Sequence, residues 1–136
     1  RKDVIGTLTP GSEGSTFGGY PLASVVGTYA IKTLIDNNLS SNAKIRGSQL
    51  MSHYEALKNE FPDKIKDVRG RGLLTAFEMF DEKHLDGHIV SVELLKKGVY
   101  AKETHHSTVR IAPALTVETH HIDIIAEQIR EVIKSL

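Results

Sequence analysis

The chain contains no cysteine and no tryptophan, and its formal net charge is zero. The lack of cysteine excludes disulfides and thiolate metal sites within its 136 residues and is compatible with a reducing cytosol. Seventeen basic residues balance seventeen acidic ones without forming a basic face, which argues against nucleic acid and anionic membranes as partners. No apolar run is long enough to span a bilayer. The composition is typical of a folded globular protein, because an apolar content of 40% is enough for a core.

A segment rich in glycine and hydroxyl groups, GSTFGGYP at residues 14–21, precedes a predicted helix. Glycine allows positive φ and close approach of the backbone to a ligand, and Pro21 suits the first turn of a helix. The hydroxyls of Ser15 and Thr16 can donate to a phosphate, which helix N-termini also attract. The segment therefore predicts an oxyanion site. Its alternative is a sharp loop into a helix without a ligand.

Hydrophobic periodicity predicts the order helix, helix, strand, strand, helix, strand, strand, helix. The expected helices cover residues 21–37, 40–61, 85–95 and 119–136, and the expected strands cover residues 65–69, 73–80, 99–102 and 108–112. Ser40 or Ser41 is expected to cap the second helix, and Thr119 the last one. Gly98 is expected to close the third helix, and the glycines at 70 and 72 to form a turn. This order favours an α/β fold in which a small, mostly antiparallel sheet is covered by helices on one side.

Four motifs in order carry a resemblance to a known family: GSTFGGxPL, DVRGRGLL, GVYAKETHH and VRIAPAL. Together they resemble the class III pyridoxal-phosphate-dependent aminotransferases, from about residue 7 to residue 136. The AKETH run at residues 101–105 and Arg110 are most similar to the ornithine aminotransferase branch. Tyr20 departs from the pattern, because relatives usually have asparagine there.

The resemblance implies a fold and a reaction. Residues 1–38 would be a remnant of the large cofactor domain of a fold type I enzyme, and residues 39–136 its C-terminal small domain. The whole enzyme would be a homodimer or higher homo-oligomer in the cytoplasm or, in a eukaryote, the mitochondrial matrix. It would move the δ-amino group of ornithine to 2-oxoglutarate, giving glutamate semialdehyde and glutamate, with pyridoxal 5'-phosphate as cofactor.

The family's cofactor lysine lies upstream of the GST segment, and the chain begins at Arg1 without it. Lys2 is the only lysine before Ser15, and its neighbours do not resemble the surroundings of the cofactor lysine. We therefore interpret the chain as the C-terminal portion of a longer enzyme. We expect no catalytic residue in it and no transaminase activity from it alone.

The resemblance also implies three binding residues. In the family, the serine-threonine pair reaches across the dimer interface to the cofactor phosphate of the neighbouring subunit, which makes Thr16 the first candidate and Ser15 the second. The family's arginine at the position of Arg110 binds a substrate carboxylate. In the ornithine branch a glutamate of the large domain holds it until the 2-oxo acid arrives.

The position of Arg110 agrees with this role. It stands between Val109 and Ile111 in an expected strand, so its side chain should face away from the core. There its guanidinium can hold a carboxylate through two parallel hydrogen bonds, a geometry that lysine cannot reproduce. The alternative is an ordinary surface arginine.

Other polar residues carry weaker signals. The pairs His105-His106 and His120-His121 invite a metal interpretation, but neighbouring side chains diverge in strands and helices, so we expect no metal site. Arg69 and Arg71 are expected to be loop or interface charges. Three further residues fit either the mouth of an active site or half-exposed strand positions: Glu78, Lys102 and Thr104.

Two alternatives remain open at this point. The first is another class III enzyme, such as acetylornithine, 4-aminobutyrate or lysine aminotransferase. The second is a free-standing, non-catalytic α/β module that binds a phosphorylated or carboxylate ligand.

Overall fold

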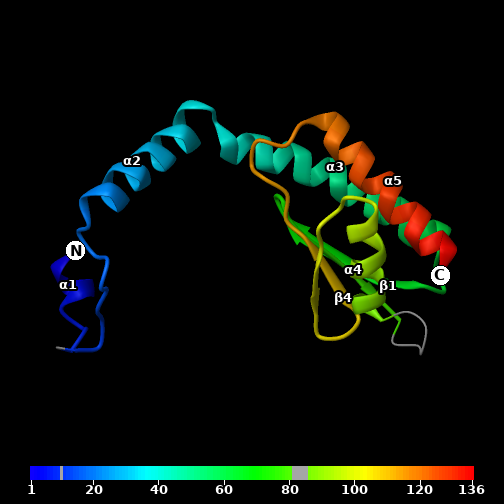
Figure 1. Ribbon diagram of the computed structural model, residues 1–136, viewed down its shortest axis with the longest axis horizontal. Coiled ribbons are helices and arrows are strands. Elements are labelled where there is room, and N and C mark those ends of the chain that lie inside the picture. Colours follow the sequence, from blue (N-terminus) through cyan, green and yellow to red (C-terminus); the bar gives the residue numbers. More distant parts are fainter. Residues whose placement is uncertain (10, 81–85) are drawn as a thin grey trace. The chain divides into compact units, whose positions relative to one another are not determined.

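A computed structural model describes residues 1–9, 11–80 and 86–136. The chain divides into two units, Arg1–Asn37 and Asn38–Leu136. The first unit contains α1 (Lys2–Ile5) and α2 (Pro21–Asp36) (Figure 1). The second contains, in chain order, α3 (Leu39–Glu60), β1 (Ile65–Arg71), β2 (Leu74–Met79), α4 (Gly87–Lys96), β3 (Lys102–Thr104), β4 (Thr108–Ile111) and α5 (Thr119–Ser135).

The first unit has no hydrophobic core of its own among its described residues. Helix α2 begins at Pro21, as predicted, with the proline at a position where the missing N–H breaks no helical hydrogen bond. None of the helix residues is buried. Tyr29 is 74% exposed and Val25 is 65% exposed. Side chains of this kind normally lie against another layer of protein.

The second unit is built on one sheet of four antiparallel strands in the order β1-β2-β4-β3. Gly72, whose φ is 56°, lies in the turn between β1 and β2. The turn between β3 and β4 holds His105 and His106, which both have positive φ. Within the described residues the sheet is therefore entirely antiparallel, as expected for a small sheet.

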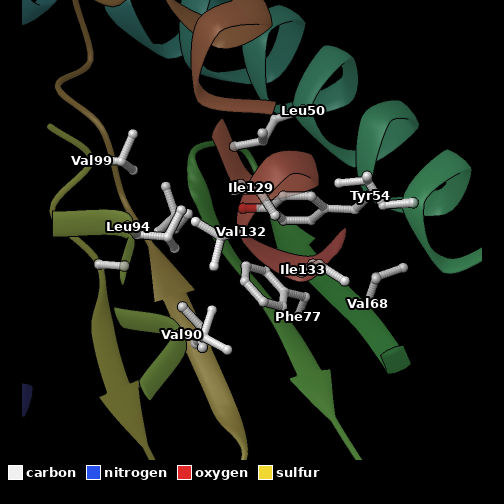
Figure 2. Packing of buried hydrophobic residues seen from close by; sticks show 14 of the residues in the cluster. Leu50, Tyr54, Val68, Phe77, Val90, Leu94, Val99, Ile129, Val132 and Ile133 are labelled. Carbon is white, nitrogen blue, oxygen red and sulfur yellow. The ribbon is translucent and has the colours of Figure 1, made fainter. Parts of the chain in front are cut away.

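Helices α3, α4 and α5 pack on one face of this sheet. Apolar residues at alternate strand positions, such as Val68, Phe77 and Val109, meet the apolar stripes of the helices (Figure 2). The rings of Tyr54 and Phe77 form an edge-to-face pair with centroids 5.6 Å apart. The strongly amphipathic α5 buries three isoleucines completely: Ile122, Ile129 and Ile133. The predicted α/β fold with helices on one side of an antiparallel sheet is confirmed.

The structure shows the starts of helices α3 and α4 in more detail than the sequence predicted. Helix α3 begins at Leu39 after Asn38, whose φ of 49° is left-handed, and not at a cap on Ser40 or Ser41. Asparagine tolerates this conformation, and the tight turn buries Leu39. Helix α4 is capped by Asp86, whose carboxylate accepts the N–H of His88 at 2.9 Å. Leu85, where this helix was expected to begin, lies outside the described residues.

Strand boundaries also differ in the middle of the chain. β1 runs through Gly70 to Arg71, because Gly70 pairs with Thr75 and the turn falls at residues 72–73. β3 lies at Lys102–Thr104, whereas the expected strand covered residues 99–102. Gly98 does follow the end of α4 with a φ of 82°, as a C-terminal glycine should.

Candidate functional site

The face of the sheet opposite the helices, the open face, carries charged and polar side chains. Directly paired residues of antiparallel strands project to the same face, so the register decides which residues are neighbours. One row across the sheet joins Arg69, Ala76, Arg110 and Lys102. The next row joins Asp67, Glu78, Thr108 and Thr104. A basic row therefore lies beside a row of carboxylates and hydroxyls.

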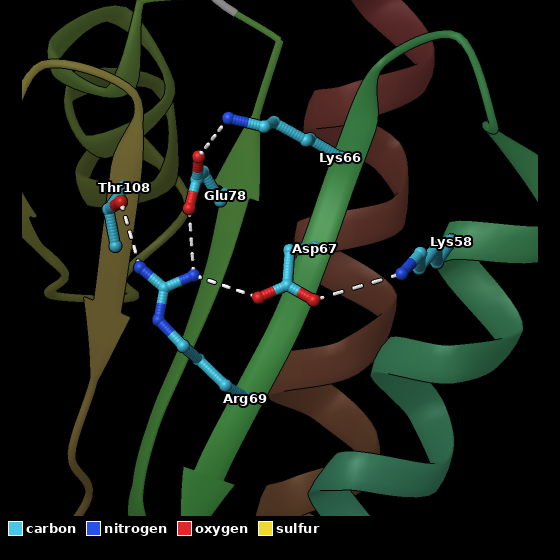
Figure 3. A network of polar contacts seen from close by, with 6 residues as sticks. All are labelled: Lys58, Lys66, Asp67, Arg69, Glu78 and Thr108. Atoms are coloured by element: carbon cyan, nitrogen blue, oxygen red, sulfur yellow. Dashed lines mark hydrogen bonds and ion pairs between the residues drawn. The ribbon is translucent and has the colours of Figure 1, made fainter.

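Arg69 is neutralised by the second row. Its Nη1 donates to Oδ2 of Asp67 at 3.0 Å and to Oε2 of Glu78 at 2.8 Å, and its Nη2 donates to the hydroxyl of Thr108 at 3.3 Å (Figure 3). Nζ of Lys66 donates to the other oxygen of Glu78 at 2.7 Å. The hydrogen bonds from Lys66 and then Arg69 lower the pKa of Glu78. Arg69 is thus a strand residue in an ion-pair network. The expectation of a loop residue was wrong for it, and a role as an interface charge stays a prediction.

Arg110 is exposed, whereas its neighbours Val109 and Ile111 are 0% and 2% exposed. Its side chain therefore faces away from the core, as the alternation of the strand predicts. Arg110 forms no ion pair and no side-chain hydrogen bond within residues 1–9, 11–80 and 86–136. As far as the described ranges show, all five guanidinium donors are available to a ligand.

Ser15 and Thr16 lie in the first unit, in an exposed loop before α2. The loop is bent by hydrogen bonds from the N–H of Gly18 to the carbonyl of Ser15 at 3.2 Å and from the N–H of Tyr20 to the carbonyl of Phe17 at 3.0 Å. Gly19, with a φ of 77°, occupies a conformation that other residues rarely adopt. Gly19 is therefore required by the shape of the loop.

Ser15 and Thr16 supply the hydroxyl donors of this loop. Neither hydroxyl of Ser15 and Thr16 makes a hydrogen bond within the part of the chain that the structure describes. Helix α2 begins without a side-chain cap and has no acidic residue in its first turn. Two free hydroxyls beside an uncapped helix N-terminus are chemically suited to a phosphate group.

The histidine pairs differ in their surroundings. His105 and His106 occupy the turn between β3 and β4. The rings of His120 and His121 lie 3.8 Å apart, and with Glu118 their ligand atoms fall within 4.8 Å of one another. The expectation that this pair diverges was therefore wrong.

A helix cap explains this cluster. The backbone N–H of Glu118 donates to Nδ1 of His121 at 3.3 Å, as part of a capping box at the start of α5. This cap was not predicted from the sequence, because Thr119, and not Glu118, was expected at the cap position. All three side chains are exposed. The absence of a metal site stays a prediction.

Comparison with known proteins identifies the relatives of this sequence. A family model described as "Aminotransferase class-III" matches residues 1–133. The mitochondrial ornithine aminotransferase of Arabidopsis thaliana is 34% identical over 135 residues, which cover 98% of this chain and 28% of that protein. Ornithine aminotransferase 1 of Staphylococcus saprophyticus is 37% identical over 134 residues, covering 98% of this chain and 32% of that protein.

Solved structures of aminotransferases have the same fold as this chain. An acetylornithine aminotransferase from Elizabethkingia anophelis superposes with a TM-score of 0.86 at 31% identity, over 100% of this chain and 34% of that one. The ornithine δ-aminotransferase of Plasmodium falciparum superposes with a TM-score of 0.83 at 32% identity, over 99% of this chain and 34% of that one. The chain therefore spans about a third of the length of the relatives that it matches.

Proposed function

The chain belongs to the class III aminotransferase family, and from this premise we propose that it is the C-terminal part of an ornithine aminotransferase. The whole enzyme would transfer the δ-amino group of ornithine to 2-oxoglutarate, giving glutamate semialdehyde and glutamate. The observation that carries the proposal is Arg110, an exposed arginine on the open face of the sheet without an acidic partner among the described residues. A substrate carboxylate is the chemical group that such an arginine fits.

We assign the first 38 residues to the large domain of that enzyme and residues 39–136 to its small domain. The exposed apolar side chains of α2, such as Val25 and Tyr29, support this assignment because they need a covering layer that the first unit does not supply. The self-contained core of the second unit agrees with a separate small domain.

The free hydroxyls of Ser15 and Thr16 fit the phosphate of pyridoxal 5'-phosphate. When bound, this cofactor supplies the electron sink that amino transfer requires. We propose that Thr16 first and Ser15 second donate hydrogen bonds to the phosphate held by the neighbouring subunit of a homodimer. A dianionic phosphate enclosed at an interface needs several directed donors, so these two residues anchor the cofactor and take no part in proton transfer.

Arg110 would bind and orient the substrate. Two parallel hydrogen bonds from its guanidinium fix both the position and the plane of a carboxylate, which holds the reacting end of the substrate in a constant orientation. The strand that carries Arg110 is anchored by the buried Val109 and Ile111, so the guanidinium projects from a rigid support. The chain thus contributes binding and orientation, and we propose that it has no transaminase activity alone.

The amino donor is inferred from one motif and from the relatives of the chain. The AKETH run at residues 101–105 and the ornithine aminotransferases among the relatives favour ornithine. The acetylornithine aminotransferase among the structural neighbours favours the second candidate, transfer from acetylornithine. Both reactions use a carboxylate site of the kind that Arg110 offers.

The test is a donor panel on the complete protein that carries this chain. Ornithine, acetylornithine, 4-aminobutyrate and lysine are each offered with 2-oxoglutarate, and glutamate formation is measured. Ornithine should give the highest kcat/KM. Preference for another donor would replace the substrate but keep the family reaction, and no glutamate from any donor would refute the proposed function.

A further inference from the structure

Two cations stand side by side on the open face of the sheet. Lys102 of β3 is directly opposite Arg110 of β4, and both side chains are exposed. Directly opposed residues of antiparallel strands have Cβ atoms roughly 4.5–5.5 Å apart. Like-charged side chains at directly opposed positions destabilise a sheet, and an anion between them relieves the repulsion.

The nearby carboxylates are engaged elsewhere. Glu103 follows Lys102 in β3 and therefore projects to the other face, where its Oε2 lies 3.0 Å from Nδ1 of His88. Glu78 lies one row away and is held by Lys66 and Arg69. Within the described ranges, neither Lys102 nor Arg110 has a carboxylate partner.

The cation on the other side of Arg110 in this row has carboxylate partners. On that side Arg110 is paired with Ala76 of β2, whose methyl group is too short to cover the guanidinium. Beyond Ala76 lies Arg69, which Asp67 and Glu78 neutralise. Within the described residues, the two cations of this row that lack a carboxylate partner are therefore Lys102 and Arg110.

We propose that Lys102 is a specificity-determining residue that binds the same substrate carboxylate as Arg110 and favours the 2-oxo acid over the amino donor. The inference rests on the proposed function, in which Arg110 holds a carboxylate. Arg110 fixes the plane of that group with two donors, and Lys102 adds a compact charge from the neighbouring strand.

The preference follows from the charge beside the carboxylate. In a 2-oxo acid the carboxylate is next to a neutral carbonyl, whereas in an amino acid it is next to an ammonium group. The two cations attract the carboxylate of both molecules, but in the amino acid their repulsion of the ammonium group offsets this attraction. Lys102 should therefore act mainly on the half-reaction that consumes the 2-oxo acid.

The experiment uses the complete enzyme that carries this chain, with Lys102→Gln, Lys102→Arg and the control Lys44→Gln. Lys44 is also an exposed lysine, but it lies on α3. Each half-reaction is followed separately in single turnovers by the absorbance of the cofactor. Lys102→Gln should raise the 2-oxoglutarate concentration for half-maximal rate by about tenfold, and Lys102→Arg should restore it to within about threefold of the unmodified enzyme. The ornithine half-reaction should change by less than about twofold in every variant, and Lys44→Gln should change neither half-reaction.

The outcomes separate the inference from the function on which it rests. If the unmodified enzyme transaminates and Lys102→Gln still binds 2-oxoglutarate normally, the role of Lys102 is refuted and the proposed function stands. Equal losses in both half-reactions would also refute it, because a general effect on the sheet gives no preference. If the unmodified enzyme forms no glutamate from any donor, both proposals fail together.

Discussion

A guanidinium nitrogen of Arg69 lies 2.8 Å from Oε2 of Glu78, and this contact joins β1 to β2 on the open face of the sheet. Lys66 holds the other oxygen of the same carboxylate at 2.7 Å. The two cations lower the pKa of Glu78 from its usual 4.5. A carboxylate whose pKa is lowered by folding stabilises the fold above its usual pKa, and this contribution is lost as the pH falls through the lowered value.

Substitution of Glu78 by glutamine should therefore change the acid branch of the stability curve. The free energy of unfolding of the unmodified chain should fall below about pH 4.5, the usual pKa of the glutamate side chain. Glu78→Gln should be less stable at neutral pH and should lose less stability on acidification, because this carboxylate no longer takes up a proton. Urea unfolding at a series of pH values measures both effects. Parallel curves for the two proteins would contradict the ion-pair network.

The buried hydroxyl of Tyr54 gives a prediction at the other end of the pH scale. Thr75 donates its hydroxyl proton to the carbonyl of Ile111 at 2.9 Å, so the phenol of Tyr54, 3.2 Å away, must donate to Thr75. Burial raises the pKa of Tyr54 above its usual 10.0. This contribution to stability is complete below the usual pKa and is lost as the pH rises toward the raised value.

Tyr54→Phe should thus be less stable at pH 7 by about 1 kcal/mol, the net worth of one hydrogen bond. The ring would keep its packing against Phe77. Above about pH 10 the difference should shrink, because only the unmodified chain has a phenol to ionise on unfolding. Denaturant titrations at pH 7 and pH 10.5 test this, and a constant difference would contradict the burial of a neutral phenol at Tyr54.

Gly47 of α3 should tolerate no side chain. A methyl group at this position would overlap the carbonyl oxygen of Gly72 in the turn between β1 and β2. Because the obstacle is backbone, Gly47→Ala should lower the free energy of unfolding by about 3 kcal/mol. Gly27→Ala on α2 is the matched control, since no atom lies within 4 Å of its added methyl group. Equal thermal stability of the two variants would argue against the close packing of α3 on this turn.

Ser15 and Thr16 should determine cofactor affinity in the complete enzyme. Thr16→Ala should weaken pyridoxal phosphate binding by about 10-fold to 100-fold, and Ser15→Ala should weaken it less, because each removes a donor to a dianion. Ser12→Ala is the control, since its hydroxyl already donates to the carbonyl of Thr9 at 2.7 Å. Equilibrium dialysis measures the affinities directly. Normal binding by both variants would exclude the phosphate role of the loop.

The order of elements could be predicted from the sequence, because apolar periodicity reports burial directly. The stripe of α5 and the alternation around Arg110 both reappear as buried and exposed positions. The caps of helices α3 and α5 were predicted less accurately. The left-handed Asn38 and the capping box at Glu118 are local alternatives to the expected serine and threonine caps, and only the packing of the following helix selects between them.

Which side chains are neighbours on the open face could not be predicted from the sequence, because it depends on strand order and register. The pairing of Lys102 with Arg110 joins two short strands through a turn, and a shift of one residue in that register would place Lys102 on the other face. The contacts from Arg69 to Glu78 and Thr108 likewise depend on the strand order β1-β2-β4. The individual residues were visible in the sequence, but the row that they form was not.

The role of Arg110 as the carboxylate site is tested most directly by the kinetics of Arg110→Lys in the complete enzyme. Arg71→Lys, at the exposed end of β1, is the matched control. Lysine keeps the charge at Arg110 but loses the two parallel hydrogen bonds to a carboxylate. We predict that kcat/KM for 2-oxoglutarate falls by at least about tenfold in Arg110→Lys and stays unchanged in Arg71→Lys. An Arg110→Lys enzyme with unaltered kcat/KM would contradict the assignment of this residue as the carboxylate site.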